Sequence, residues 1–212
     1  MTTTQFSFDD INGKIAVIPG GADVLCGAFA RALAGVGAKI ALLDINKNAA
    51  QKEAEDIAKL SGAQVIGIAC DVLSKKSLEA AYIQINAEFG PIDILVNGAG
   101  GNAKSATTEI EQISDMVDAP KSFYGLEIDG FNSVFNLNFI GTLLPTQILS
   151  QDMSHKNLAL LSTFHRWRRF IRCRKFLLIL QQKRLYQTSR NGWLYIWHQW
   201  AFGSTPWHQG SL

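Results

Sequence analysis

The chain has 212 residues, a length that fits one domain, and its 47% of hydrophobic residues is ordinary for a globular protein. Its formal net charge of +2 combines two opposite blocks. Residues 1–153 carry 10 Lys+Arg and all 18 Asp+Glu, a net charge of −8, whereas residues 154–212 carry 10 basic residues and no acid, a net charge of +10. The basic total therefore gives no reason to expect a nucleic-acid partner for the first block.

The N-terminal residues, the apolar runs and the cysteines disfavour several classes of protein. The N-terminal residues lack a charged segment followed by an apolar core, so we expect no signal peptide. No apolar run is long enough to span a bilayer, so we expect no membrane association. The cysteines lie far apart and without metal-ligand spacing, at Cys26, Cys70 and Cys173. This pattern favours a cytoplasmic protein with buried thiols and no metal site, rather than one with disulfides.

Short apolar runs alternate with helical segments along the first block. Strands are predicted at residues 14–18, 39–43, 64–69 and 92–96, and helices at residues 24–36, 47–60 and 75–89. In the first helix the apolar face is predicted to consist of Leu25, Phe29, Leu33 and Val36. Residues 101–127 are polar and predict a lid or loop over the strand ends, and residues 128–152 predict one long packed helix. The alternation predicts an α/β fold with a Rossmann-like, doubly wound parallel sheet.

A glycine-rich turn, Gly20-Gly21, follows the first predicted strand and precedes a helix. Such a turn lets the backbone approach a pyrophosphate, which then lies at the helix N-terminus. Asp44 ends the second strand, where its carboxylate would accept the ribose hydroxyls of NAD and repel the 2′-phosphate of NADP. The alternative interpretation is an ordinary strand-to-helix turn with Asp44 as a cap.

Four segments in the same order give a resemblance to a known family. They are residues 17–21 (VIPGG), 70–72 (CDV), 97–100 (NGAG) and 138–142 (NFIGT). With these matches, residues 10–153 resemble the short-chain dehydrogenase/reductase family. The sequences NGAGGN and NLNFIGTLLPTQ are most similar to those of its D-mannonate oxidoreductase, or fructuronate reductase, branch.

The resemblance implies hydride transfer between a nicotinamide and the carbonyl of a small sugar acid such as D-fructuronate, in a homo-oligomer. It implies that Asp71 meets the adenine ring and that Asn138 belongs to a catalytic tetrad, where it anchors a water relay. The cofactor-binding residues it implies are Gly20, Gly21, Val24, Leu25, Asp44, Asp71, Val72, Asn97, Ala99 and Gly100.

Three residues of the turn depart from the family pattern. Pro19 stands where the family has Thr, so a hydroxyl and a backbone donor are missing. Asp23 places a carboxylate in the phosphate turn, where negative charge opposes the ligand. Cys26 replaces a small glycine, although Gly27 follows it. We expect Pro19 and Asp23 to weaken cofactor binding.

Residues 154–212 lack the rest of the tetrad. The family requires a Ser and, thirteen residues later, Tyr-x-x-x-Lys, in which Tyr is the general acid/base. The chain offers only Tyr186 followed by Arg190, and Arg is a poor substitute for Lys. We therefore expect this chain to be inactive.

The genetic code suggests why the second block differs. Reading the third base of each codon with the first two bases of the next permits a Ser, a Tyr-x-x-x-Lys and a Pro-Gly segment in family order. Some junctions are forced, since Trp197-His198 must give Ala and Trp200-Ala201 must give Gly. We therefore interpret residues 1–153 as the cofactor-binding domain of a short-chain dehydrogenase, incomplete after its fourth strand. Residues 154–212 would be an out-of-frame, prematurely ended tail.

A second interpretation of the tail stays open. Residues 165–170 (HRWRRF) interleave cations and aromatics, a composition that suits single-stranded nucleic acid or an anionic membrane surface. The chain would then be a non-catalytic remnant with a basic tail. The frame interpretation predicts instead no nucleic-acid partner, and a fourth strand left with an unpaired apolar edge.

Overall fold

The structure, a computed structural model, describes residues 8–110, 122–155, 160–163 and 177–178. Its first half alternates strands and helices as predicted. The strands are β1 (Ile15–Pro19), β2 (Lys39–Asp44), β3 (Val65–Ala69) and β4 (Ile94–Asn97). The helices between them are α1 (Val24–Gly35), α2 (Lys47–Ser61) and α3 (Lys75–Glu88), after a short 3-10 turn at Phe8–Ile11. The predicted α/β fold with its doubly wound sheet is confirmed.

The sheet has the strand order β3-β2-β1-β4-β5-β6. β1 lies between β2 and β4 and is parallel to both, with Val17 opposite Ala41 on one side and Leu95 on the other. The chain therefore moves outward in one direction through β2 and β3, and in the other direction through β4. The point where this direction reverses, between β1 and β4, is where doubly wound sheets bind ligands.

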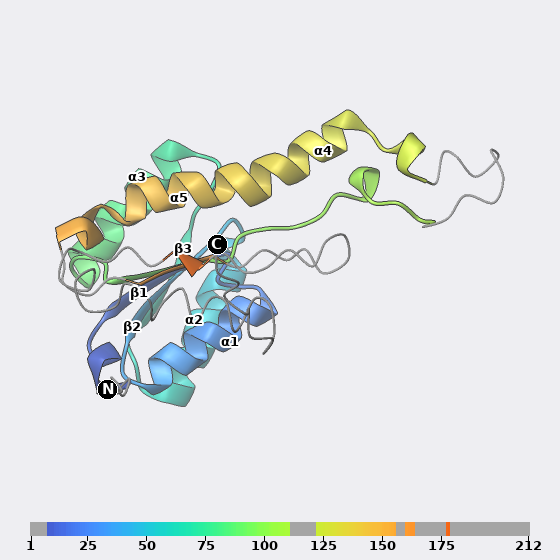
Figure 1. Ribbon diagram of the computed structural model, residues 1–212. Helices are drawn as coiled ribbons and strands as arrows, with labels where there is room; N and C mark the ends of the chain where they lie inside the picture. The colour runs from blue at the N-terminus through green and yellow to red at the C-terminus, as the bar shows by residue number, and fades with distance from the viewer. Residues whose placement is uncertain (1–7, 111–121, 156–159, 164–176, 179–212) are drawn as a thin grey trace, which may run out of the picture.

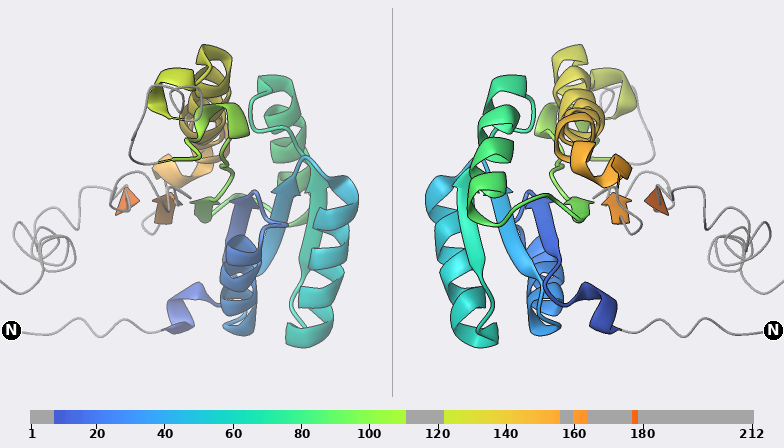
Figure 2. Two further views of the ribbon diagram at one scale, coloured as in Figure 1. Left: turned by 90° about the vertical axis from the view of Figure 1, so that its right-hand side faces the viewer. Right: turned by 90° about the vertical axis from the view of Figure 1, so that its left-hand side faces the viewer.

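Helices cover both faces of the sheet (Figures 1 and 2). On one face, alternate strand residues such as Ile18, Ile40 and Leu42 pack with α1 and α2. On the other face, residues such as Leu43 and Leu95 pack with α3 and the last long helix. Both Cys26 and Cys70 are buried.

Helix α1 packs through small residues. Its buried residues are Cys26, Gly27, Ala30 and Ala34. The predicted apolar face is wrong as the buried face, because Leu25 is 56% exposed and Phe29 36% exposed. The buried stripe of small residues allows the helix backbone to approach the sheet closely.

The helix predicted at residues 128–152 is one continuous helical run with a change of winding in the middle. It comprises α4 (Ile128–Phe135), a π-helix η5 (Asn136–Ile140) and α5 (Gly141–Leu149), and a 3-10 turn η6 (Gln151–His155) follows. Single π-helical turns inside α-helices are often found at functional sites. Here the π segment contains Asn138, which the family resemblance had singled out.

The segment after β4 runs alongside this helix (Figure 1). It contains a short 3-10 turn, η2 (Lys104–Ala106), against which α4 packs, and Glu127 N–H donates to the carbonyl of Ser105 at 3.0 Å. A second turn, η4 (Phe123–Gly125), precedes α4. The first part of the predicted lid, residues 101–110, therefore lies along α4, and residues 111–121 fall outside the described part.

Strand β4 has a neighbour on its far side. β5 (Leu160–Thr163) is parallel to β4, with Asn97 opposite Thr163, and β6 (Leu177–Leu178) is antiparallel to β5. The prediction that β4 keeps an unpaired edge is therefore wrong. Ladder hydrogen bonds come from the backbone, so a short segment with apolar residues is able to pair there whatever its reading frame. Residues 165–170 and 186–190 lie outside the described residues.

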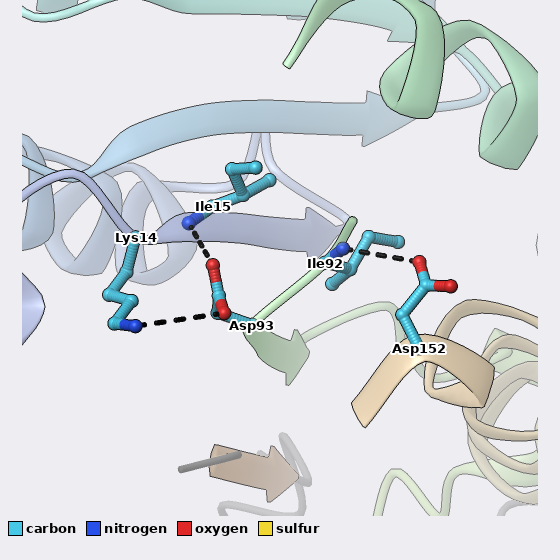
Figure 3. Close-up of polar contacts among 5 residues, drawn as sticks. All are labelled: Lys14, Ile15, Ile92, Asp93 and Asp152. Carbon is cyan, nitrogen blue, oxygen red and sulfur yellow. Dashed lines mark hydrogen bonds and ion pairs between the residues drawn. The ribbon is translucent and has the colours of Figure 1, made fainter. Parts of the chain in front are cut away.

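Two carboxylates fix the opposite edge of the sheet, where β1 and β4 begin (Figure 3). Asp93 accepts a hydrogen bond from the Ile15 N–H at 3.0 Å and forms an ion pair with Lys14 at 3.9 Å. Asp152 accepts from the Ile92 N–H at 3.2 Å and from the Tyr82 hydroxyl at 2.7 Å. Asp152 thus joins η6 to α3 and to the start of β4.

Candidate functional site

The sequence-predicted cofactor residues gather at the carboxyl edge of the sheet. They follow β1 (Gly20, Gly21, Val24, Leu25), end β2 (Asp44), follow β3 (Asp71, Val72), or end and follow β4 (Asn97, Ala99, Gly100). Because these four strands are parallel and adjacent, all ten residues are brought to one edge, across the point where strand order reverses.

The turn after β1 requires glycine at position 20. Gly20 has φ of +74°, and a Cβ there would come within 2.7 Å of the Ala99 nitrogen and 2.8 Å of its Cα. The N–H groups of Gly20 and Gly21 donate to the carbonyl of Leu43 at 2.7 and 3.0 Å. The turn is thereby held flat against the strand ends, with its backbone pressed on the loop that follows β4.

Helix α1 presents an open N-terminus beside this turn. Asp23 occupies the N-cap position but makes no side-chain capping hydrogen bond, and the first turn contains no acidic residue. Val24 and Leu25 at its start are 82% and 56% exposed. Unpaired N–H groups and the helix dipole make such an end favourable for an anion, and Asp23 beside it adds a negative charge that opposes one.

Asp44 is held between the turn and helix α2. Its Oδ2 accepts from the Ala22 N–H at 3.3 Å, and its Oδ1 accepts from the Asn46 N–H at 3.0 Å. The N-cap of α2 is Asn46, whose side chain accepts from the Ala49 N–H. The carboxylate is half-buried at the end of β2 and is oriented by backbone donors on both sides.

The residues after β3 differ in exposure. Asp71 is half-buried and its Oδ1 accepts from the Leu73 N–H at 2.9 Å, while its own N–H donates to the Ser77 hydroxyl at 3.0 Å. Val72 is only 6% exposed and lies against Gly141 at the start of α5. Asp71 is therefore partly accessible after β3, whereas Val72 is buried against the start of α5.

Asn138 holds the loop that follows β4. Its Nδ2 donates to the carbonyls of Gly101 at 2.7 Å and Val134 at 2.8 Å, and its Oδ1 accepts from the Gly101 N–H at 3.3 Å. A Cβ at Gly100 would lie 2.7 Å from the same Oδ1. The side chain is 5% exposed, so the described contacts of Asn138 fix the loop.

A row of hydroxyl groups continues from Asn138 along α5, and the sequence reasoning missed it. The Thr142 hydroxyl donates to the carbonyl of Asn138 at 3.0 Å, and the Thr146 hydroxyl donates to the carbonyl of Thr142 at 2.8 Å. Asn97 then donates from Nδ2 to the Thr146 hydroxyl at 2.9 Å. The spacing of four residues from 138 to 142 to 146, which places them on one helix face, was the available signal.

Asn97 itself points inward rather than toward the edge. It is 1% exposed, and its Oδ1 has no hydrogen-bond partner among the described residues. Its side chain therefore connects β4 to α5, and its backbone leads into the loop of Gly98 to Gly101.

The site fits the phosphate and ribose parts of a dinucleotide. In the turn after β1, a Cβ at position 20 would clash with Ala99, so the turn requires glycine. The N-terminus of α1 lies beside this turn, and the carboxylate of Asp44 is fixed at the end of β2. The described residues do not supply a Tyr-x-x-x-Lys, since the fourth residues after Tyr82 and Tyr124 are Asn86 and Ile128. Ser162 and Thr163 end β5, in backbone register with Val96 and Asn97.

The described residues show neither a metal cluster nor a membrane-spanning helix. No group of three or more potential metal ligands occurs there. Within the same residues, no helix has both the length and the apolar character needed to cross a bilayer.

Comparisons with known proteins match the region that contains this site. An uncharacterized oxidoreductase of Haemophilus influenzae is 40% identical over 148 residues, covering 69% of this chain and 52% of the relative. The uncharacterized oxidoreductase UxuB of Bacillus subtilis is 38% identical over 145 residues, covering 68% and 51%. A crystal structure with bound NAD, of a protein from Haemophilus influenza provisionally named D-mannonate oxidoreductase, has a TM-score of 0.68 and 39% identity. That match covers 72% of this chain and 54% of the other.

This chain therefore spans about half the length of the relatives it matches. A family model described as short chain dehydrogenase matches residues 14–159, from the start of β1 to the segment before β5. With more than half of its residues in that match, the chain belongs to the short-chain dehydrogenase family.

Proposed function

We propose that the carboxyl edge of β1 to β4 binds a nicotinamide dinucleotide, and NAD in preference to NADP. The observation that carries this is the pairing of the Gly20 turn with Asp44, whose Oδ2 accepts from the Ala22 N–H within the turn itself. A carboxylate in this position hydrogen-bonds ribose hydroxyls and repels a 2′-phosphate. Bound there, the nicotinamide would supply hydride transfer.

We further propose that the ancestral reaction is hydride transfer to or from a small sugar acid, and that this chain does not turn over. The relative with a D-mannonate oxidoreductase name supports the substrate class. Loss of a general acid/base alone costs about 10²- to 10⁴-fold in rate. An assay with D-fructuronate and NADH that shows turnover well above background would overturn the inactivity.

The charge division supports a proposal about residues 154–212, namely that they are read out of frame. Those residues carry no acid and 10 basic residues, unlike the block before them. Resequencing the gene from the codon of Gly141 through the stop tests this directly. A genomic sequence that holds no Ser, Tyr-x-x-x-Lys and Pro-Gly in the alternative frame would contradict it.

A homo-oligomer is supported by an apolar stripe on the long helix. Ile128, Phe131, Phe135, Phe139 and Leu143 are all exposed, between 41% and 72%, and recur every three or four residues. The rings of Phe135 and Phe139 stack with centroids 5.1 Å apart. Contiguous exposed apolar surface of this kind marks interaction sites, and we propose that a second copy covers it.

The cofactor proposal is tested by titrating the full chain with NADH and NADPH while following nicotinamide fluorescence. We expect NADH to bind more tightly than NADPH, and Asp44→Asn to weaken NADH binding by about tenfold, because it removes a charged acceptor. Glu55→Gln, an exposed residue of α2, is the matched loss of one charge and is expected to have no effect. Absence of saturable NADH binding by the parent chain would overturn the proposal.

A further inference from the structure

Cys26 and Gly98 come together beneath the candidate site. Cys26 lies on the buried face of α1 and is 3% exposed. Gly98 is the first residue after β4, and a Cβ built on it would overlap with the Sγ of Cys26. The next nearest atoms would be the Pro19 carbonyl oxygen at 3.2 Å and the Cys26 Cβ at 3.7 Å.

The contact with sulfur is what requires glycine at position 98. Gly98 does not have a positive φ, so its backbone conformation is open to any residue. Of the three nearest atoms, the Pro19 oxygen would lie at a tight distance and the Cys26 Cβ at an ordinary one, and the overlap is with the sulfur alone. The thiol therefore occupies the space that a side chain at position 98 would need.

The same two segments meet at two other points. The Gly98 N–H donates to the Pro19 carbonyl at 3.0 Å, and the turn at Gly20 presses against Ala99. One of these segments is the proposed phosphate turn, and the other is the loop that Asn138 holds. The Cys26–Gly98 contact lies between them, on the side of α1.

We propose that Cys26 and Gly98 form a size-matched pair that sets the spacing between the phosphate turn and the loop after β4. Both are positioning residues for the dinucleotide, and this inference rests on the proposed NAD site. A side chain at position 98 pushes α1 and its N-terminus away from the loop while the thiol is present. It is accommodated once the thiol is removed.

A double-mutant cycle on the full chain tests the pair. The variants are Cys26→Ala, Gly98→Ala and the double variant, each measured for its NADH dissociation constant and for its unfolding in urea. Gly35→Ala is the matched control, because a Cβ there meets nothing within 4 Å and the residue lies at the other end of α1.

We expect Gly98→Ala to raise the NADH dissociation constant by about tenfold, a coupling typical of residues in contact. The Gly35→Ala control should change it less than about threefold, and the dissociation constant of Cys26→Ala is the reference for the double variant. Adding Gly98→Ala to Cys26→Ala should then cost less than about threefold. This rescue of affinity separates positioning from a general loss of stability. The double variant carries the smaller alanine in place of the buried Cys26 and yet still binds NADH.

Each other outcome decides the inference. Equal weakening by Gly98→Ala with and without the thiol overturns it, as does binding by Gly98→Ala equal to that of the parent. If Gly98→Ala does not fold and the double variant folds and binds, the pair is supported. If the parent does not bind NADH, the proposed function fails and the positioning role fails with it. The urea cycle then still shows whether the two residues are coupled.

Discussion

Asn97 at the end of β4 donates a hydrogen bond from Nδ2 to the hydroxyl of Thr146 on α5, at 2.9 Å. The Thr146 hydroxyl donates in turn to the carbonyl of Thr142 at 2.8 Å, so it is both an acceptor and a donor. Asn97 is almost completely buried, and its amide nitrogen would have no described acceptor without Thr146. This single hydroxyl therefore joins the carboxyl edge of the sheet to the helix that carries Asn138.

Thr146→Val is expected to lower the free energy of unfolding by about 1–3 kcal/mol, the cost of leaving a buried polar group unpaired. Thr146→Ser keeps the hydroxyl and should lose much less. Urea denaturation followed by circular dichroism measures both. Thr107→Val, which removes an exposed hydroxyl bonded to the Ala103 carbonyl, is the control and should change stability by under about 0.5 kcal/mol. Similar losses for Val and Ser at position 146 would show that the hydrogen bond is unimportant.

Asp23→Asn is expected to strengthen NADH binding and, at the same time, to lower the stability of helix α1. The change removes a negative charge beside the proposed pyrophosphate position, a gain of about two- to fivefold at low ionic strength that salt should diminish. The same charge favours the N-terminus of α1, so stability should fall by up to about 1 kcal/mol. Titration with NADH at two salt concentrations measures the first effect. A gain in affinity that does not depend on salt would argue against an electrostatic cause.

Tyr82 is expected to make the stability of the fold decline at alkaline pH. Its hydrogen bond to Asp152 raises the pKa of the Tyr82 hydroxyl, with smaller contributions from burial and from the charge of Asp152. A raised pKa in the folded state means that the stabilisation is fully present below the unfolded tyrosine pKa, near 10, and is lost as the pH rises through the folded value. Unfolding measured from pH 8 to 11 should show this decline.

Tyr82→Phe should remove that part of the alkaline decline and lower stability below pH 10. The exposed Tyr124, 75% accessible on η4, provides the control Tyr124→Phe, which should leave the profile unchanged. An alkaline decline of the same size in Tyr82→Phe and in the parent would assign it to other groups.

Phe135→Glu is expected to lower the association state of the protein, because it places a charge in the exposed stripe of α4 and α5. Light scattering after size-exclusion chromatography measures this. Ile83→Glu, on the exposed side of α3 at 67% accessibility, introduces the same charge outside the stripe and should leave the mass unchanged. A parent chain that is already monomeric at high concentration would refute the proposed homo-oligomer.

The strands of the first block were predictable because each is a short apolar run that ends in a turn. The packing of α1 was not, since the periodicity of Leu25 and Phe29 is visible in the sequence, whereas a close approach through Gly27 and Ala30 depends on the neighbouring elements. β5 was not predicted because residues 154–212 differ in composition from the first block and were interpreted as an out-of-frame tail, although Leu160–Thr163 forms a strand.

At the site, the residues that touch the edge could be found from motifs, but the residues that hold them could not. Gly20 and Asp44 lie at fixed places in a strand-turn-helix-strand order. The contacts of Asn97 with Thr146 and of Cys26 with Gly98 join positions 49 and 72 residues apart in sequence, and only the fold brings them together. The space left by Gly98 is where the Cys26 side chain lies, on helix α1 at a position where the family has glycine.

Asp152 is the last acidic residue of the chain, and it is also the residue that fastens the end of the long helix to α3 and β4. A protein cut just before it would lose the acceptor of the Tyr82 hydroxyl and of the Ile92 N–H together. One cut after His155 would retain both. The change in composition along the chain therefore falls just beyond Asp152, which secures the end of the α/β unit. A recombinant form of that unit should be designed to finish in η6.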